Sequence, residues 1–372
     1  MNGTNSGRYF VAIIAFIVLT GCAQTKYRFE YHKPESDIVW PQEPDTPRYQ
    51  FVGDIQGENN FKEIEGSAGV LRQGANWLGR LLFGEEAPRL LYRPQSGAID
   101  NKNKRLYITD VGRKAIYVFD MRKGSVDVWE GINSDQNFIA PIAISLISEE
   151  NLLVTDSELG LIAQFDSEGN YQKQFGDKSL TRPTGITYDA ANKRVFVADS
   201  AAHRIEVFSE EGKWLFAIGG KGEIDGKLNS PTFLTFANGK LFVADTLNAR
   251  VQSFDSDGKW LNSFGRRGMS VGDLPRPKGV AVDSEGHIYV VESYYDFLLV
   301  FNELGQGLLP IGGTGNNPGQ FYLPTGVWVD DTDRVYVADM FNSRISVFQY
   351  LKQDSTALGG ATPKTSALKS EP

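Results

Sequence analysis

Residues 334–348 read RVYVADMFNSRISVF, and two further segments of the chain repeat this pattern. Residues 194–208 read RVFVADSAAHRIEVF, and residues 240–254 read KLFVADTLNARVQSF. In each copy an alternating apolar run ends in Val-Ala-Asp, and an arginine opens the next apolar run five residues after the aspartate. Self-similarity of this length is the mark of a repeat architecture, so it decides the fold class before any single residue does.

Acidic residues recur along the chain at nearly constant spacing, and a proline stands 14 to 16 residues before each of them. The acids are Asp110, Asp156, Asp199, Asp245, Glu292 and Asp339, and the prolines are Pro94, Pro141, Pro183, Pro231, Pro277 and Pro324. Each unit holds four short apolar runs of period two, which is typical of one four-stranded propeller blade. We therefore predict an all-β fold, a six-bladed β-propeller over residues 48–351.

The ring is expected to close through the N-terminal part of this domain. Arg48–Gly53 (RYQFVG) resembles the fourth apolar run of the other units, but it precedes the first unit. The last unit lacks a fourth run of its own. Because an unpaired sheet edge invites aggregation, we predict that this N-terminal strand completes the last blade.

The N-terminus carries a targeting signal over residues 1–21. Arg8 precedes an apolar core at residues 9–19, which is too short to span a bilayer. Leu19-Thr-Gly-Cys22 resembles the bacterial lipoprotein signal, and this resemblance implies lipid attachment at Cys22 in the cell envelope. By the same resemblance, Gln24 in place of an aspartate implies no inner-membrane retention, so the outer membrane is expected. An ordinary signal peptide with a chance cysteine is the alternative. Cys22 is the only cysteine, so no intramolecular disulfide is expected.

Three further segments do not fit the repeat. Residues 22–47 are rich in proline and charge and are expected to form a tether. Residues 65–90 are expected to form an insertion, with a short amphipathic helix near residues 69–84 that packs on the body or contacts a membrane or partner. The Ser/Thr/Gly-rich residues 352–372 are expected to be disordered.

The VADxxNxRI-x-VF pattern, preceded by Pro-x-Gly, resembles the NHL repeat, and the resemblance implies the same propeller fold. Such propellers include binding platforms, scaffolds and enzymes, so the fold does not fix the function. Because the acid and the arginine recur from blade to blade, we interpret them as a structural brace across a turn. The expected pairs are Asp199 with Arg204, Asp245 with Arg250, and Asp339 with Arg344.

Function is expected where the repeat fails, above all at residues 292–297 (ESYYDF), where Glu replaces Asp and Phe replaces Arg. Lys278 is the single charge among the residues that follow the six prolines, and it could pair with Glu292. The candidate ligand face comprises Lys278, Glu292, Tyr294, Tyr295, Asp296, Phe341, Arg113 and His203. Drift of a solvated loop surface is the alternative.

The net charge of −8, without a Lys/Arg run, argues against nucleic acid as a partner. The three histidines, His32, His203 and His287, form no recognisable zinc or catalytic pattern. No catalytic residue or cofactor is expected, although Ca²⁺ held by oxygen ligands in the channel stays open. The expected function is a lipid-anchored envelope module that binds or scaffolds a protein. The alternatives are a lactonase-like hydrolase or lyase with a channel metal, and carbohydrate binding through Tyr294, Tyr295 and Phe341.

Overall fold

The computed structural model describes residues 26–64, 87–148, 150–176 and 179–352. The predicted signal peptide, Cys22, the helix near residues 69–84 and nearly all of the 352–372 tail lie outside the described residues. Within them, no helix is long and apolar enough to cross a lipid bilayer.

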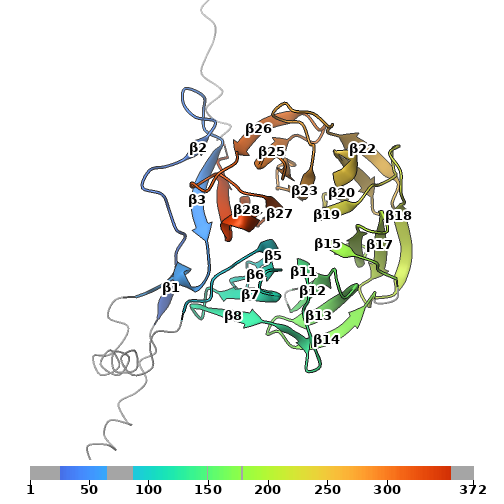
Figure 1. Ribbon diagram of the computed structural model, residues 1–372, viewed down its shortest axis with the longest axis horizontal. Coiled ribbons are helices and arrows are strands. Elements are labelled where there is room, and N and C mark those ends of the chain that lie inside the picture. The colour runs from blue at the N-terminus through green and yellow to red at the C-terminus, as the bar shows by residue number, and fades with distance from the viewer. Residues whose placement is uncertain (1–25, 65–86, 149, 177–178, 353–372) are drawn as a thin grey trace, which may run out of the picture.

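Six antiparallel sheets stand in a ring around a central channel (Figure 1). The first five sheets each have four strands in chain order. Blade 1 holds β5 (Pro94–Asp100), β6 (Arg105–Asp110), β7 (Ala115–Asp120) and β8 (Ser125–Trp129); blade 2 holds β11 (Pro141–Leu146), β12 (Asn151–Asp156), β13 (Leu161–Asp166) and β14 (Tyr171–Phe175); blade 3 holds β15 (Pro183–Asp189), β16 (Arg194–Asp199), β17 (Arg204–Ser209) and β18 (Trp214–Gly219); blade 4 holds β19 (Pro231–Ala237), β20 (Lys240–Asp245), β21 (Arg250–Asp255) and β22 (Trp260–Phe264); blade 5 holds β23 (Pro277–Val282), β24 (Ile288–Glu292), β25 (Phe297–Phe301) and β26 (Gly307–Gly312). The predicted six-bladed propeller with four-stranded blades is confirmed.

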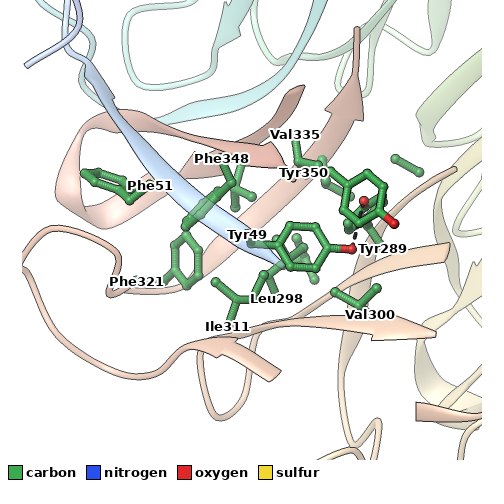
Figure 2. Close-up of a cluster of buried hydrophobic side chains, with 14 residues drawn as sticks. Tyr49, Phe51, Tyr289, Leu298, Val300, Ile311, Phe321, Val335, Phe348 and Tyr350 are labelled. Carbon is green, nitrogen blue, oxygen red and sulfur yellow. Dashed lines mark hydrogen bonds between the residues drawn. The ribbon is translucent and has the colours of Figure 1, made fainter. Parts of the chain in front are cut away.

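Blade 6 is closed by the N-terminal part of the chain, as predicted. Its order is β27 (Pro324–Val329), β28 (Arg334–Asp339), β29 (Arg344–Tyr350), β3 (Tyr49–Ile55) and β2 (Val39–Trp40). Phe348 of β29 lies opposite Phe51 of β3, and their rings meet 5.5 Å apart (Figure 2). The fifth strand, β2, was not predicted; Trp40 on it packs edge-on against Phe348. The segment expected as a tether therefore contributes to the body of the propeller.

The remaining elements are short and lie outside the blades. β1 (Tyr27–Phe29) pairs with β4 (Phe61–Glu63), and β9 (Gly131–Asn133) pairs with β10 (Gln136–Asn137). Three 3-10 turns complete the described chain: η1 (Glu58–Asn60), η2 (Thr246–Asn248) and η3 (Met340–Asn342). The last two follow directly on the strands that end in Asp245 and Asp339, so they form the turns between the second and third strands of their blades.

The hydrophobic core lies between neighbouring blades rather than within one of them. In β16, Val195, Phe196 and Val197 are all fully buried, although they point alternately to the two faces of the sheet. Val195 and Val197 pack toward blade 2, whereas Phe196 packs toward blade 4, where it stacks on Phe236 at 5.6 Å. Because each blade buries both faces against its neighbours, the blades depend on a closed ring.

Each blade begins where the sequence placed its proline. All six prolines open a first strand, and all six acids end a second strand. Glycine at the third position of Pro-x-Gly permits a close approach to the next blade. A Cβ on Gly185 would lie 2.7 Å from the backbone oxygen of Thr232, and one on Gly326 would lie 2.4 Å from that of Gln95. The motif thus lets the innermost strands converge on the channel.

Candidate functional site

The carboxylate that ends each second strand binds the loop that enters the same blade. Asp199 accepts hydrogen bonds from the backbone N–H groups of Thr181 (2.6 Å) and Arg182 (2.9 Å), which directly precede Pro183. Equivalent bonds run to Asp110 from Tyr92 and Arg93, to Asp156 from Ile139 and Ala140, to Asp245 from Asn229, to Glu292 from Arg276, and to Asp339 from Tyr322. These backbone bonds were not expected, although the fixed spacing of proline and acid is their signal in the sequence.

Two of the three expected arginine braces occur as ion pairs. Arg250 Nε lies 2.9 Å from Asp245 Oδ2, and Arg344 Nε lies 2.8 Å from Asp339 Oδ2. Burial raises the pKa of Asp339 to about 6 even with Arg344 beside it. These pairs are structural, because the same guanidinium groups also donate to backbone oxygens of the loops that enter their blades, at Ile224 and Lys227 for Arg250 and at Asn317 and Gln320 for Arg344.

The expected pair of Asp199 with Arg204 needs correction. The Arg204 guanidinium hydrogen-bonds to Glu206 instead, two residues along the same strand and on the same face. Glu206 is fully buried and accepts a second bond from Trp214 Nε1 at 2.7 Å. Blades 4 and 6 have Gln252 and Ser346 at the position of Glu206. Only blade 3 therefore offers the arginine a competing carboxylate there.

Blade 5 uses its unusual acids structurally. Glu292 accepts bonds from the backbone N–H groups of Arg276 (2.9 Å), Tyr294 (3.0 Å) and Tyr295 (2.8 Å). Asp296 is buried and accepts bonds from the backbone N–H of Leu323 (2.9 Å) and the hydroxyl of Thr314 (2.8 Å). Burial raises the pKa of both carboxyl groups. Neither acid is directed outward as a ligand group.

Lys278 does not form the expected pair with Glu292. Both oxygens of Glu292 accept hydrogen bonds from backbone N–H groups instead. The side chain of Lys278 has no hydrogen-bond or ion-pair partner among the described residues, although it is partly buried. The lysine stands where the innermost strand of blade 5 begins, directly after Pro277.

Of the other residues in the predicted ligand face, some form structural contacts and others are exposed at the surface. His203 Nδ1 accepts a hydrogen bond from the backbone N–H of Ser230 at 3.0 Å, which joins two loops. Tyr294 has 63% of its surface exposed, and its ring meets that of Tyr295 edge-on at 4.8 Å. Arg113 and Phe341 lie in a cluster at the seam of blades 6 and 1.

That cluster, called the aromatic patch below, comprises Tyr92, Arg93, Arg113, Tyr322 and Phe341. Arg93 lies over the rings of Tyr92 (5.2 Å) and Phe341 (5.5 Å), and Arg113 lies over Tyr92 at 5.6 Å. Tyr322 meets Phe341 edge-on at 5.4 Å. Tyr92, Arg93 and Tyr322 were not predicted. The sequence marks these three residues only by their position, one or two residues before a proline that opens a blade.

The channel is lined mostly by apolar and backbone atoms. A cavity of about 310 Å³ lies between the innermost strands and is bordered by segments such as Ser96–Ile99, Phe233–Ala237 and Val280–Val282. In the described part of the chain, no group of three or more His, Cys, Asp or Glu side chains is placed to hold a metal ion. In these segments, a metal ion in the channel, which was left open above, would therefore have no carboxylate cluster to bind it.

Comparison with known families agrees with the fold. A model described as the NHL repeat matches residues 180–208, and a model described as a 6-bladed beta-propeller matches residues 281–353. The chain is a six-bladed β-propeller, and part of its third blade matches the NHL repeat. The NHL match covers β15, β16 and nearly all of β17 in blade 3, and the second match covers most of blades 5 and 6 of this propeller.

One curated protein matches part of this propeller. Protein brain tumor of Drosophila melanogaster is 27% identical over 127 residues, which are 33% of this chain and 12% of that protein. The chain therefore spans only a small part of this curated relative.

Solved structures with the same fold differ in function. Virginiamycin B lyase from Staphylococcus aureus is 14% identical with a TM-score of 0.53, over 70% of this chain and 95% of that one. A gluconolactonase from Xanthomonas campestris is 17% identical with a TM-score of 0.53, over 70% and 89%. An auxiliary nutrient binding protein from Bacteroides thetaiotaomicron is 12% identical with a TM-score of 0.55, over 70% of each chain. At such identities these likenesses show the fold alone.

Proposed function

We propose that this propeller is a lipid-anchored binding module of the bacterial cell envelope, which docks a protein partner on its aromatic patch. The observation that carries the proposal is the exposure of three large aromatic side chains side by side. Tyr92, Tyr322 and Phe341 leave 48%, 49% and 43% of their surfaces exposed. Contiguous apolar surface of this kind on a soluble domain usually serves an interaction.

The composition of the patch supports a protein as the partner. Tyrosine, phenylalanine and arginine are enriched in protein interfaces, and tyrosine and arginine dominate their energetic hot spots. The guanidinium groups of Arg93 and Arg113 already lie over the ring of Tyr92. A docked carboxylate or backbone carbonyl could accept from their outer N–H groups without breaking these contacts.

The patch is also held in place before any partner binds. Ser343 donates from its hydroxyl to the backbone oxygen of Tyr92 at 2.7 Å, which ties blade 6 to the entry of blade 1. The backbone N–H of Phe341 donates to the backbone oxygen of Tyr322 at 3.1 Å. Loops fixed in this way lose little conformational entropy on binding, and this favours affinity.

The test is site-specific cross-linking in the native membrane. A photo-reactive amino acid at Phe341 should capture one abundant envelope protein, whereas the same group at Leu261, on the outer strand β22, should not. The captured protein is then purified and titrated against Phe341→Ala and the matched control Leu261→Ala. We expect the Phe341 variant to bind at least about thirtyfold more weakly, which is the effect of losing a hot-spot side chain. Equal affinities of the two variants would contradict the proposal.

Membrane anchorage is proposed separately, through a lipid on Cys22. Cys22→Ser is expected to move the protein from the membrane fraction to the soluble or precursor pool. Mature protein that stays with the membrane after this substitution would contradict anchorage by lipid. The control is wild type, which should stay with the outer membrane on density-gradient separation of the envelope.

The alternative functions have their own measurements. Metal analysis of the purified protein tests the enzyme alternative. One tightly bound divalent ion per chain would contradict a role in binding alone and favour an enzyme. Selective binding to a glycan array, lost in Tyr294→Ala and Phe341→Ala, would replace the protein partner with a carbohydrate.

A further inference from the structure

The mouth of the channel is built from the residues that follow the blade-opening prolines. Threonines join these residues from blade to blade: Thr184 donates from its hydroxyl to the backbone oxygen of Thr232 at 2.8 Å, and Thr232 donates in the same way to Lys278 at 3.0 Å. Blades 3, 4 and 5 are thereby linked in sequence at the entrance. The bond from Thr232 holds the backbone of Lys278 in place, so the base of the lysine side chain is fixed at the channel mouth.

Arginines precede the blade-opening prolines in alternate blades. Arg93, Arg182 and Arg276 each stand directly before the proline that opens blades 1, 3 and 5. The corresponding residues in blades 2, 4 and 6 are uncharged: Ala140, Ser230 and Leu323. Of these three arginines, Arg182 and Arg276 lie near enough to Lys278 to act on its ammonium group.

Nearby carboxylates do not neutralise Lys278. Asp199, Asp245 and Glu292 are committed to backbone N–H groups of the entry loops. Glu158 approaches Arg182 at 3.8 Å, but both side chains are more than half exposed, and such a pair contributes little. The pKa of the Lys278 ammonium is lowered, first by burial and then by the positive charges of Arg276 and Arg182.

A partly buried charge without a counter-ion is costly, and proteins rarely keep one unless something pairs with it. We propose that the channel mouth is an anion-binding site, in which Lys278 and the flanking Arg276 and Arg182 bind a phosphate or carboxylate group of a small ligand. The ammonium supplies a point charge at the strand start, and the two guanidinium groups approach from the rim with planar pairs of donors. This site is separate from the aromatic patch and needs no protein partner.

The test uses inorganic phosphate and, in a second series, citrate, each titrated into purified full-length protein at constant ionic strength maintained with sodium chloride. Phosphate or citrate should raise the midpoint of thermal unfolding of wild type, and calorimetry gives the Kd. Lys278→Met should weaken the Kd about tenfold or more, as expected when a charge-assisted hydrogen bond is lost. The matched control is Lys259→Met, an exposed lysine in the β21–β22 loop at the opposite end of the blades.

Two further results complete the test. Without added anion, Lys278→Met should unfold at a higher temperature than wild type, because it removes an unpaired charge, and Lys278→Arg should keep the anion response. The response to phosphate compared with citrate identifies which of the two groups the site prefers. An equal response of the Lys278→Met and Lys259→Met proteins to both anions would overturn the proposal. If Lys278→Met does not fold, the single variant Arg276→Gln decides in its place. A weaker anion response of Arg276→Gln than of Lys259→Met supports the site, and equal responses overturn it.

Discussion

The hydroxyl oxygen of Tyr49 lies 3.1 Å from that of Tyr289, a hydrogen bond that joins the closing strand of blade 6 to blade 5 (Figure 2). The Tyr289 hydroxyl donates onward to Asp283 Oδ2 at 2.8 Å. Burial raises the pKa of both tyrosines, so both stay neutral and able to donate. The closing strand β3 therefore binds blade 5 as well as completing its own sheet.

The closing strand should contribute strongly to stability. Phe51→Ala removes a buried ring that packs on Phe348, and we expect a loss of about 3–5 kcal/mol in the free energy of unfolding, measured by urea denaturation. Leu304→Ala, at a side chain that is 75% exposed, is the control and should change the free energy by less than about 0.5 kcal/mol. Similar unfolding midpoints for the two variants would show that β3 does not close the ring.

Arg344 should matter more than any surface arginine or lysine. It binds Asp339 and also Asp54 of the closing strand, where Nη1 and Oδ2 lie 3.0 Å apart. Arg344→Met leaves two buried carboxylates without their cation, and we expect a loss of about 3–5 kcal/mol in thermal or urea unfolding. Lys240→Met, which breaks an exposed pair with Glu303, should cost at most about 1 kcal/mol. A loss as small as that of Lys240→Met would show that the ion pairs of Arg344 contribute little to the stability of the ring.

Most of the fold could be predicted because it repeats. The prolines and acids fixed the start of every first strand and the end of every second strand, and the missing fourth run of the last unit predicted the closure by β3. The two-residue strand β2 could not be predicted, because it is too short to show any periodicity. Its pairing depends on Trp40 reaching Phe348, which is a tertiary contact.

The candidate site was harder to predict because loops carry no period. Glu292 and Asp296 differ from the repeat, yet their carboxylates hold backbone N–H groups, so deviation alone did not distinguish ligand groups from turn groups. Tyr92 and Tyr322 belong to entry loops of unlike length and sequence. Only the folded ring brings them together with Phe341 across the seam of blades 6 and 1.

The glycine of Pro-x-Gly should be irreplaceable at the seams. Gly326→Ala would place a methyl group 2.4 Å from the backbone oxygen of Gln95 in blade 1, and we expect a loss of about 1–3 kcal/mol, measured by thermal unfolding. Gly307→Ala is the matched control, since its Cβ would meet only a side-chain carbon of Phe301 at 3.8 Å. A tolerated Gly326→Ala would mean that the innermost strands can separate without cost.

The ion pair of His287 and Asp283 should make stability depend on pH. His287 Nδ1 lies 2.8 Å from Asp283 Oδ2, and this hydrogen bond raises the pKa of the imidazole against the opposing effect of burial. Glu285 and Asp333 add negative charge nearby, and the ring of Tyr350 lies 5.0 Å away. Because the folded protein holds the proton more tightly than the unfolded chain, the stabilisation is fully present below the ordinary histidine pKa of about 6.5. It is lost as the pH rises through the raised value.

Urea unfolding of wild type at a series of pH values from 5.5 to 8.5 should therefore show stability falling across this window. His287→Phe keeps a ring in the site but removes the proton, so its stability should fall less steeply over the same range. Tyr350→Phe is the control: it keeps the His287–Asp283 pair and removes only the 3.0 Å hydrogen bond from the Tyr350 hydroxyl to Glu285. Its stability should follow the wild-type slope, because the pKa of Tyr350 is raised to about 12, far above the window. Parallel pH profiles for His287→Phe and wild type would show that this pair does not couple protonation to the stability of the seam between blades 5 and 6.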